Sequence, residues 1–218
     1  MIISVLNQKG GVGKTTLSIH IASTIALAGY SVLLIDADVQ RSALDWAATR
    51  DKEPLFNVVG IPSSNIHKEV KMLEPKYDYI IIDGPPRVYD VAKAVIAASD
   101  YVVIPVQPSP YDVWSAEEIV NLINEVKTTL APYKKIDAGF VINRKIANSV
   151  IGRDVTEALG KYPFPVLEAS IHQRVAFTET AAQGSSAIEE DPDSIAGKEI
   201  KALVEEILSK INSKIAAA

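Results

Sequence analysis

The stretch "NQKGGVGKTT", residues 7–16, follows the short apolar run "IISVLN" at 2–7 and decides what fold to expect. Its glycines let the backbone turn its N–H groups inward around phosphate oxygens: Gly10, Gly11 and Gly13. A helix that starts at Lys14 adds partial positive charge at its N-terminus. Because the loop follows an expected strand and opens an expected helix, a glycine-rich turn without a ligand is the weaker reading, and the stretch predicts a phosphate-binding loop.

The generic phosphate-loop pattern has glycine, four residues and then Gly-Lys-Ser/Thr, and this chain departs from it at one position. Gly13-Lys14-Thr15 supplies the end of the pattern, whereas Gln8 stands where the first glycine belongs. We expect Lys14 to reach the β- and γ-phosphates and the Thr15 hydroxyl to bind Mg²⁺. One nucleotide needs one such lysine, so the loop itself leaves Lys9 without a role.

Composition bounds the rest of the chain. With 218 residues, 48% hydrophobic and 22% charged, the chain has apolar material for one sizeable core, and we expect residues 1–218 to form a single domain. It contains no cysteine, which excludes disulfides, thiolate metal sites and iron–sulfur clusters and favours a cytoplasmic location. The net charge of −5 means that any contact with nucleic acid depends on a local basic patch.

Apolar runs alternate with segments of helical period along the whole chain, which predicts an α/β fold with a mostly parallel central sheet of about seven or eight strands. The expected strands are 2–7, 31–36, 56–61, 77–83, 100–106, 137–143 and 164–169. The expected helices are 14–28, 41–49, 65–73, 88–97, 113–130, 149–160, 174–183 and 194–214. The strands at 31–36 and 77–83 are the most apolar and are expected in the centre of the sheet.

Two of these strands end in acidic residues, where carboxylates for Mg²⁺ and for the attacking water are needed. "YIIIDGPP" places Asp83 after a buried strand, in the form of a Walker B aspartate that would hold Mg²⁺. "LLIDADVQ" places Asp36 and Asp38 two residues apart at the end of another strand. Asp36 can equally be a helix cap, whereas for Asp83 the cap is the weaker interpretation.

The segment "KGGVGKTT", residues 9–16, resembles the deviant phosphate loop of the ParA/MinD family of dimeric ATPases. The resemblance implies ATP and Mg²⁺ as ligands, with the phosphates bound by Lys9, Gly10, Gly11, Val12, Gly13, Lys14, Thr15 and Thr16. It also implies that Lys9 is a signature lysine that crosses a dimer interface to the partner's phosphates and acts in catalysis with Lys14. The alternative reading of Lys9 is a solvated lysine at the edge of the loop.

The same resemblance assigns the acidic residues. Asp38 would position the hydrolytic water and contribute to the metal site with Thr15 and Asp83, although this chain has Asp38-Val39-Gln40 where the family often has Asp-Pro-Gln. The missing proline loosens the backbone but leaves both functional side chains in place.

Two later segments resemble the family's base-binding side. In "PVQPSPYDVWSAEE", residues 105–118, Pro108 and Ser109 would border the nucleotide, and Asp112 would cap the following helix. In "FVINRK", residues 140–145, Asn143 would read the adenine edge, because an amide both donates and accepts. Arg144 would stack on the base or face nucleic acid.

The function implied by the resemblance is a switch in which ATP drives formation of a homodimer that binds DNA nonspecifically. A ParB-like centromere-binding adaptor would stimulate hydrolysis, and the outcome would be partition of a plasmid or chromosome. DNA contacts are expected from Lys145, Arg153 and Arg174, with the protein on the nucleoid when ATP is bound. The apolar face of the terminal helix is expected to pack on the sheet, so no membrane role is expected.

Two other functions remain open. A relative that positions a protein cargo would use the same switch, and only its partner would tell the two apart. A biosynthetic ligase of the same fold would use ATP without the signature lysine, and Lys9 counts against it.

Overall fold

The computed structural model describes residues 1–146 and 151–215 as one α/β unit. Six parallel strands form the sheet in the order β3-β2-β4-β1-β5-β6. They are β1 (Ile2–Val5), β2 (Val32–Asp36), β3 (Asn57–Gly60), β4 (Tyr79–Asp83), β5 (Tyr101–Val106) and β6 (Asp137–Ile142). The α/β class and the parallel sheet are confirmed, and β4 lies in the centre as expected, with β2 one strand from the β3 edge.

The sheet is smaller than the seven or eight strands expected. The segment 164–169 contributes a single parallel bridge, between Phe140 and Val166, at the free edge of β6. Its backbone bonds to β6 are those of Phe140 N to Pro165 O and Leu167 N to Phe140 O. The chain therefore runs alongside β6 too briefly to become a strand.

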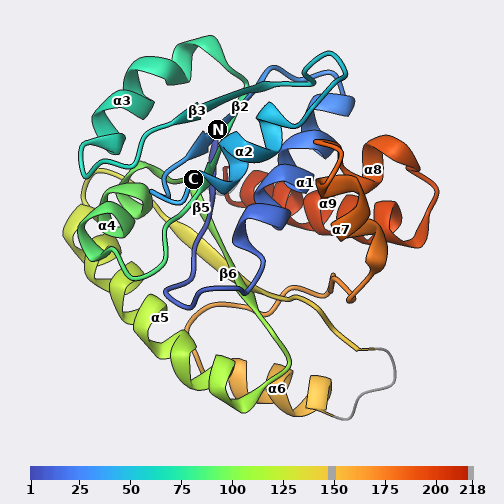
Figure 1. The fold of residues 1–218 in the computed structure, drawn as a ribbon. Coiled ribbons are helices and arrows are strands. Elements are labelled where there is room, and N and C mark those ends of the chain that lie inside the picture. The colour runs from blue at the N-terminus through green and yellow to red at the C-terminus, as the bar shows by residue number, and fades with distance from the viewer. Residues whose placement is uncertain (147–150, 216–218) are drawn as a thin grey trace.

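Helices cover both faces of the sheet, as Figure 1 shows. One face carries α3 (Ile66–Leu73), α4 (Tyr89–Ala98), α5 (Pro110–Leu130) and α6 (Ile151–Leu159). The other carries α1 (Lys14–Leu27), α2 (Ser42–Ala48), α7 (Val175–Ala181), α8 (Ala187–Glu190) and α9 (Ile195–Ile215). A short 3₁₀ turn, Glu74–Lys76, follows α3. Of these, α8 was not expected from the sequence.

Alternation along the buried strands divides the core into two layers. In β4, Ile80 and Ile82 pack toward α3 and α4, whereas Ile81 packs toward α1. This period of two is what a strand buried on both faces requires.

The terminal helix packs as expected. Ile200, Leu203 and Ile207 of α9 are buried in the layer that also contains α1. In the part of the chain that the structure describes, no helix combines the length and apolar character needed to cross a bilayer.

Because every strand runs in the same direction, the carboxyl ends of β2, β4, β1, β5 and β6 meet at one edge of the sheet. The candidate site residues on strand ends lie at this edge or in the loops that leave it.

Candidate functional site

The phosphate loop connects β1 to α1 and depends on glycine at two positions. Gly11 and Gly13 have φ of 75° and 92°, a left-handed region that glycine enters without steric cost. At Gly13 a Cβ would also lie 2.3 Å from Asn143 Nδ2, so a side chain there has no room. Backbone conformation thus explains Gly11 and Gly13, and close packing adds a second reason at Gly13.

Side chains from neighbouring strands brace this loop. Asn7 Nδ2 donates to Pro105 O at 2.8 Å, and Asn7 Oδ1 accepts from Lys9 N at 3.0 Å. Farther along the loop, Gln107 Nε2 donates to Gly11 O at 2.9 Å. The loop is therefore held to the ends of β1 and β5. Sequence reasoning missed Asn7 and Gln107, because nothing local indicates that their amides face the loop.

Asn143, at the end of β6, is a third brace. Its Nδ2 donates to Val12 O at 2.7 Å, and its Oδ1 accepts from Arg144 N at 3.0 Å. The side chain thus fixes the loop it was expected to lie beside. Each of its groups keeps further bonding capacity, so its contact with adenine stays a prediction.

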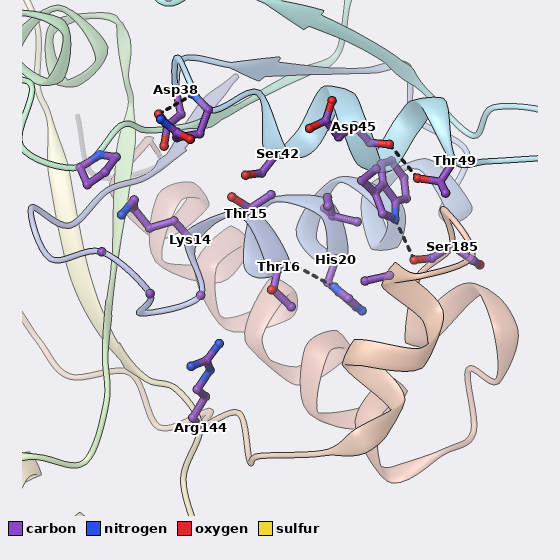
Figure 2. Close-up of a pocket in the computed structure, with 18 residues that line it drawn as sticks. Lys14, Thr15, Thr16, His20, Asp38, Ser42, Asp45, Thr49, Arg144 and Ser185 are labelled. Carbon is purple, nitrogen blue, oxygen red and sulfur yellow. Dashed lines mark hydrogen bonds between the residues drawn. The ribbon is translucent and has the colours of Figure 1, made fainter.

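Lys14 lies in the cavity that the loop encloses (Figure 2). Its side chain is almost buried, at 7% exposed, and Nζ donates to Lys9 O at 3.0 Å. Burial lowers the pKa of this ammonium, while the charges of Asp83 and Asp38 partly restore it. A desolvated cation facing two carboxylates is suited to bind an anion together with a metal ion.

Asp83 ends β4 beside Lys14. Its Oδ1 accepts from Ser18 Oγ at 3.3 Å, and its Oδ2 has no hydrogen-bond partner among the described residues. Burial raises the pKa of Asp83 to about 7, with Thr15, Lys14 and Ser18 acting in the opposite direction. A buried carboxylate oxygen without a partner is what a residue reserved for a cation looks like, so Asp83 and Thr15 fit the expected Mg²⁺ ligands.

Asp36 ends β2 directly opposite Asp83 in the sheet register. It is fully buried, and its oxygens accept from Asp38 N at 3.0 Å, Ala43 N at 2.9 Å and Leu44 N at 3.2 Å. The last two donors belong to the first turn of α2. Of the two readings left open for Asp36, the structure supports the cap.

Asp38 lies two residues beyond Asp36 and lines the same cavity as Lys14. Its Oδ1 accepts from Gln40 N at 3.0 Å, and its second oxygen accepts no hydrogen bond from the described residues. Figure 2 shows Asp38 on the far side of the cavity from the loop, with Ser42 between it and Thr15. The geometry allows Asp38 to face a water beside a terminal phosphate.

Two cavities adjoin at the loop. The first, of about 530 Å³, is lined by the glycines, Lys14, Asp38 and the start of α2. The second, of about 1010 Å³, lies between the end of β6 and α7 and is lined by Asn143, Lys145 and Phe177 among others. Arg144 lines both cavities, with its guanidinium pointing toward Thr16 in Figure 2. Together, the two cavities offer space for a phosphate chain followed by a base.

The remaining residues that were expected to contact the nucleotide lie outside both cavities. Pro108 and Ser109 line neither cavity, and Ser109 instead precedes the first residue of α5. Their contact with a nucleotide stays a prediction. Lys9 also lines neither cavity.

The expected cap at Asp112 is wrong. Helix α5 begins at Pro110, so Asp112 lies in its first turn, and its side chain makes no capping bond. The carboxylate instead accepts from Lys9 Nζ at 2.6 Å. The two residues are 103 positions apart, a separation that no local sequence signal bridges.

Of the expected DNA contacts, Arg174 is already neutralised. Its guanidinium donates to both oxygens of Glu199, which also accepts from His172 N and Nδ1. The Glu199 bond raises the pKa of Arg174 further. Lys145 keeps a loose contact of 3.5 Å with Ser170 Oγ, and the side chain of Arg153 lies outside what the structure describes.

Comparison with known proteins identifies the family. Residues 3–187 match the model of the CobQ/CobB/MinD/ParA nucleotide-binding domain. The chain is 27% identical to maintenance of carboxysome distribution protein A of Halothiobacillus neapolitanus, over 84% of this chain and 85% of that protein. It is 28% identical to the sporulation initiation inhibitor Soj of Bacillus subtilis, over 88% and 92% of the two chains.

Solved structures share the fold. MinD of Pyrococcus horikoshii in complex with Mg-ADP gives a TM-score of 0.70 at 20% identity, over 94% of this chain and 95% of that one. A putative plasmid partition protein of Borrelia burgdorferi bound to AMPPNP gives 0.71 at 22% identity, over 96% and 98%.

Proposed function

This chain belongs to the CobQ/CobB/MinD/ParA family of nucleotide-binding domains, and we therefore propose that it is an ATPase that dimerises on ATP and drives DNA partition. The observation that carries the proposal is the different placement of two lysines in one loop. Lys14 lines the phosphate cavity, whereas Lys9, 35% exposed, lines neither cavity of its own chain. A lysine that lies outside both cavities of its own chain is available to a nucleotide held by a second copy.

The residues around the cavity divide the work of hydrolysis. Lys14 and the loop N–H groups would bind the β- and γ-phosphates, and Asp83 with Thr15 would hold Mg²⁺. The Asp83 oxygen that has no hydrogen-bond partner among the described residues is suited to that ligand role. When bound, Mg²⁺ neutralises charge on the phosphate oxygens. Asp38 holds and orients the attacking water. Lys9 from the second copy stabilises the charge that develops on transfer, as an added cation does in related hydrolases.

Lys9→Ala tests the proposal directly. Since Lys14 and the loop remain, the variant should bind ATP with affinity close to wild type, but it should stay monomeric and lose hydrolysis stimulated by dimerisation. Sedimentation velocity with a nonhydrolysable ATP analogue measures the first and phosphate release the second. Lys71→Ala, which removes an exposed charge from α3, is the matched control. Normal assembly of the Lys9 variant would refute the trans role.

The DNA-binding part of the proposal now depends on Lys145 more than on Arg174, whose charge Glu199 already balances. Lys145→Ala should weaken binding to all DNA sequences alike and lower the salt dependence of binding by about one unit of slope. Fluorescence anisotropy on two unrelated duplexes over a salt series measures both. Retained affinity would remove Lys145 from the DNA surface.

The similarity to a carboxysome distribution protein favours a second candidate, in which the same ATP switch positions a protein assembly. A deletion strain separates the two. Loss of a replicon from daughter cells supports partition, whereas normal inheritance with a misplaced protein assembly supports positioning.

A further inference from the structure

The side chain of Lys9 is held inside its own subunit. Asp112, in the first turn of α5, is only 2% exposed, and its Oδ2 accepts from Lys9 Nζ at 2.6 Å. The other carboxylate oxygen has no hydrogen-bond partner among the described residues. Lys9 is therefore the cation that compensates a buried carboxylate, and removing such a partner is costly. This excludes the reading of Lys9 as a solvated lysine at the edge of the loop.

The backbone of Lys9 is fixed independently of that ion pair. Its N–H donates to Asn7 Oδ1 at 3.0 Å, and its carbonyl accepts from Lys14 Nζ at 3.0 Å. The four-carbon side chain is thus the part of Lys9 that can move, and about a third of this side chain is exposed to water. A flexible stem on a fixed backbone can carry the charge from one partner to another.

We propose that Asp112 is a positioning residue that latches Lys9 within its own subunit, and that this ion pair opens when Lys9 moves to the phosphates held by a second copy. The inference rests on the proposed function. The two positions of Lys9 exclude one another, because Asp112 is buried in its own chain and an ammonium 2.6 Å from it does not reach into another subunit. The free energy needed to separate the ion pair makes dimer formation less favourable by the same amount. The latch therefore sets the ATP concentration at which dimers form.

Asp112→Asn tests the latch, because the amide keeps the shape of the carboxylate and removes its charge. The concentration of a nonhydrolysable ATP analogue that gives half-maximal dimer, measured by sedimentation velocity, should fall at least about fivefold, the low end of typical coupling between linked equilibria. Asp90→Asn makes the same chemical change at an exposed site in the first turn of α4 and should leave this concentration unchanged.

In a Lys9→Ala background, which should stay monomeric, Asp112→Asn should not restore dimers, since no lysine is then left to release. Dimers formed by the Lys9→Ala, Asp112→Asn double variant would show that Asp112 affects assembly independently of Lys9. An unchanged or increased half-maximal concentration for Asp112→Asn in the wild-type background would overturn the latch.

Denaturant unfolding without nucleotide tests the ion pair itself. Lys9→Ala leaves the Asp112 charge buried and uncompensated, so it should unfold at lower denaturant concentration than wild type, and adding Asp112→Asn should recover most of the loss. Additive effects of the two substitutions would overturn the pair.

The assembly and unfolding experiments separate failure of the latch from failure of the proposed function. If wild type dimerises with the analogue and Asp112→Asn does so at the same concentration, the latch alone fails. If neither protein dimerises at saturating analogue, the proposed function fails, and the latch has no assembly to regulate. Dimers formed by Asp112→Asn where wild type stays monomeric would support the latch most strongly.

Discussion

Strands β2 and β4 lie side by side and both end in an aspartate, but the two aspartates have different roles. Asp36 and Asp83 are paired in register and both are buried. Each is followed by a loop that contains an arginine with left-handed backbone, Arg41 or Arg87. The Asp36 carboxylate is consumed by three backbone N–H groups, whereas one Asp83 oxygen has no partner among the described residues. Asp36 therefore stabilises the backbone around the site, whereas Asp83 keeps one oxygen available to a ligand.

Asp83→Asn gives the largest expected effect and tests whether that availability matters. Losing a carboxylate that holds Mg²⁺ should lower ATP hydrolysis by about a thousandfold, the equivalent of several kcal/mol of transition-state stabilisation. At pH above about 7, where Asp83 is charged, the substitution removes a buried charge, so the variant should then be at least as stable as wild type without metal. Phosphate release and thermal unfolding measure the two outcomes. Turnover near wild type would show that Asp83 is not a metal ligand.

The pH dependence of stability should report the burial of Asp83 directly. Burial raises the pKa of Asp83 from 3.8 to about 7, so between these values the folded chain holds a proton that the unfolded chain has lost. The free energy of unfolding of the metal-free protein should therefore fall as pH rises through this window, by about 4 kcal/mol at most. Chemical denaturation at several pH values measures it.

Asp83→Asn is the control for this titration, because the amide cannot take up or release the proton that Asp83 does. His20 acts in the opposite direction: burial lowers its pKa to about 4, so it favours folding as pH rises toward its ordinary value. It contributes equally to both proteins, and the difference between their curves isolates Asp83. Parallel curves for wild type and variant would contradict the assignment.

How far the sequence predicts these two strand ends depends on the range of the interactions involved. The apolar runs place Asp36 and Asp83 correctly at strand ends, and the glycine pattern places the phosphate loop, because both signals are local. The difference between the aspartates depends on where α2 begins relative to β2, and the sequence left the cap and the ligand readings of Asp36 open.

Contacts between distant segments were beyond prediction for the same reason. The ion pair of Lys9 with Asp112 and the brace from Gln107 to the loop each join residues about a hundred positions apart. The apolar segment 164–169 has the composition of a strand but makes one bridge, because the return of the chain past β6 is set by the rest of the fold. Local pattern predicts elements and their order, whereas pairing at the edge requires the assembled structure.

Asp36→Ala should have the next largest effect, on stability instead of chemistry. It removes the acceptor for the N–H groups of Ala43 and Leu44 at the start of α2, and for that of Asp38. We expect a loss of about 2 kcal/mol in the free energy of unfolding, the scale of a lost helix cap that leaves buried donors unpaired.

Asp45→Ala is the matched control for Asp36→Ala, because it removes an exposed carboxylate on the same helix and should cost about 0.5 kcal/mol or less. Equal losses in the two variants, measured by denaturant unfolding, would mean that Asp36 does not cap α2. A loss of hydrolysis without a loss of stability in Asp36→Ala would instead place Asp36 with Asp83 as a residue of the chemistry.

The smallest expected effect concerns the arginines with left-handed backbone in the two loops. Arg41 and Arg87 have φ of 59° and 52°, a region that costs a residue with a Cβ roughly 1–2 kcal/mol. Replacement by glycine relieves this strain but adds freedom to the unfolded chain, so each glycine variant should gain only about 0.5 kcal/mol. Each alanine variant keeps the strain and should be no more stable than wild type, which makes it the control. Both guanidinium groups are exposed and make no hydrogen bond or ion pair with the described residues, so no side-chain contact within that part of the chain offsets the strain. A gain in denaturation midpoint for glycine over alanine at both positions would show that the two loops share their backbone strain as well as their place in the sheet. A gain at only one position would show that the ends of β2 and β4 differ in conformation as well as in chemistry.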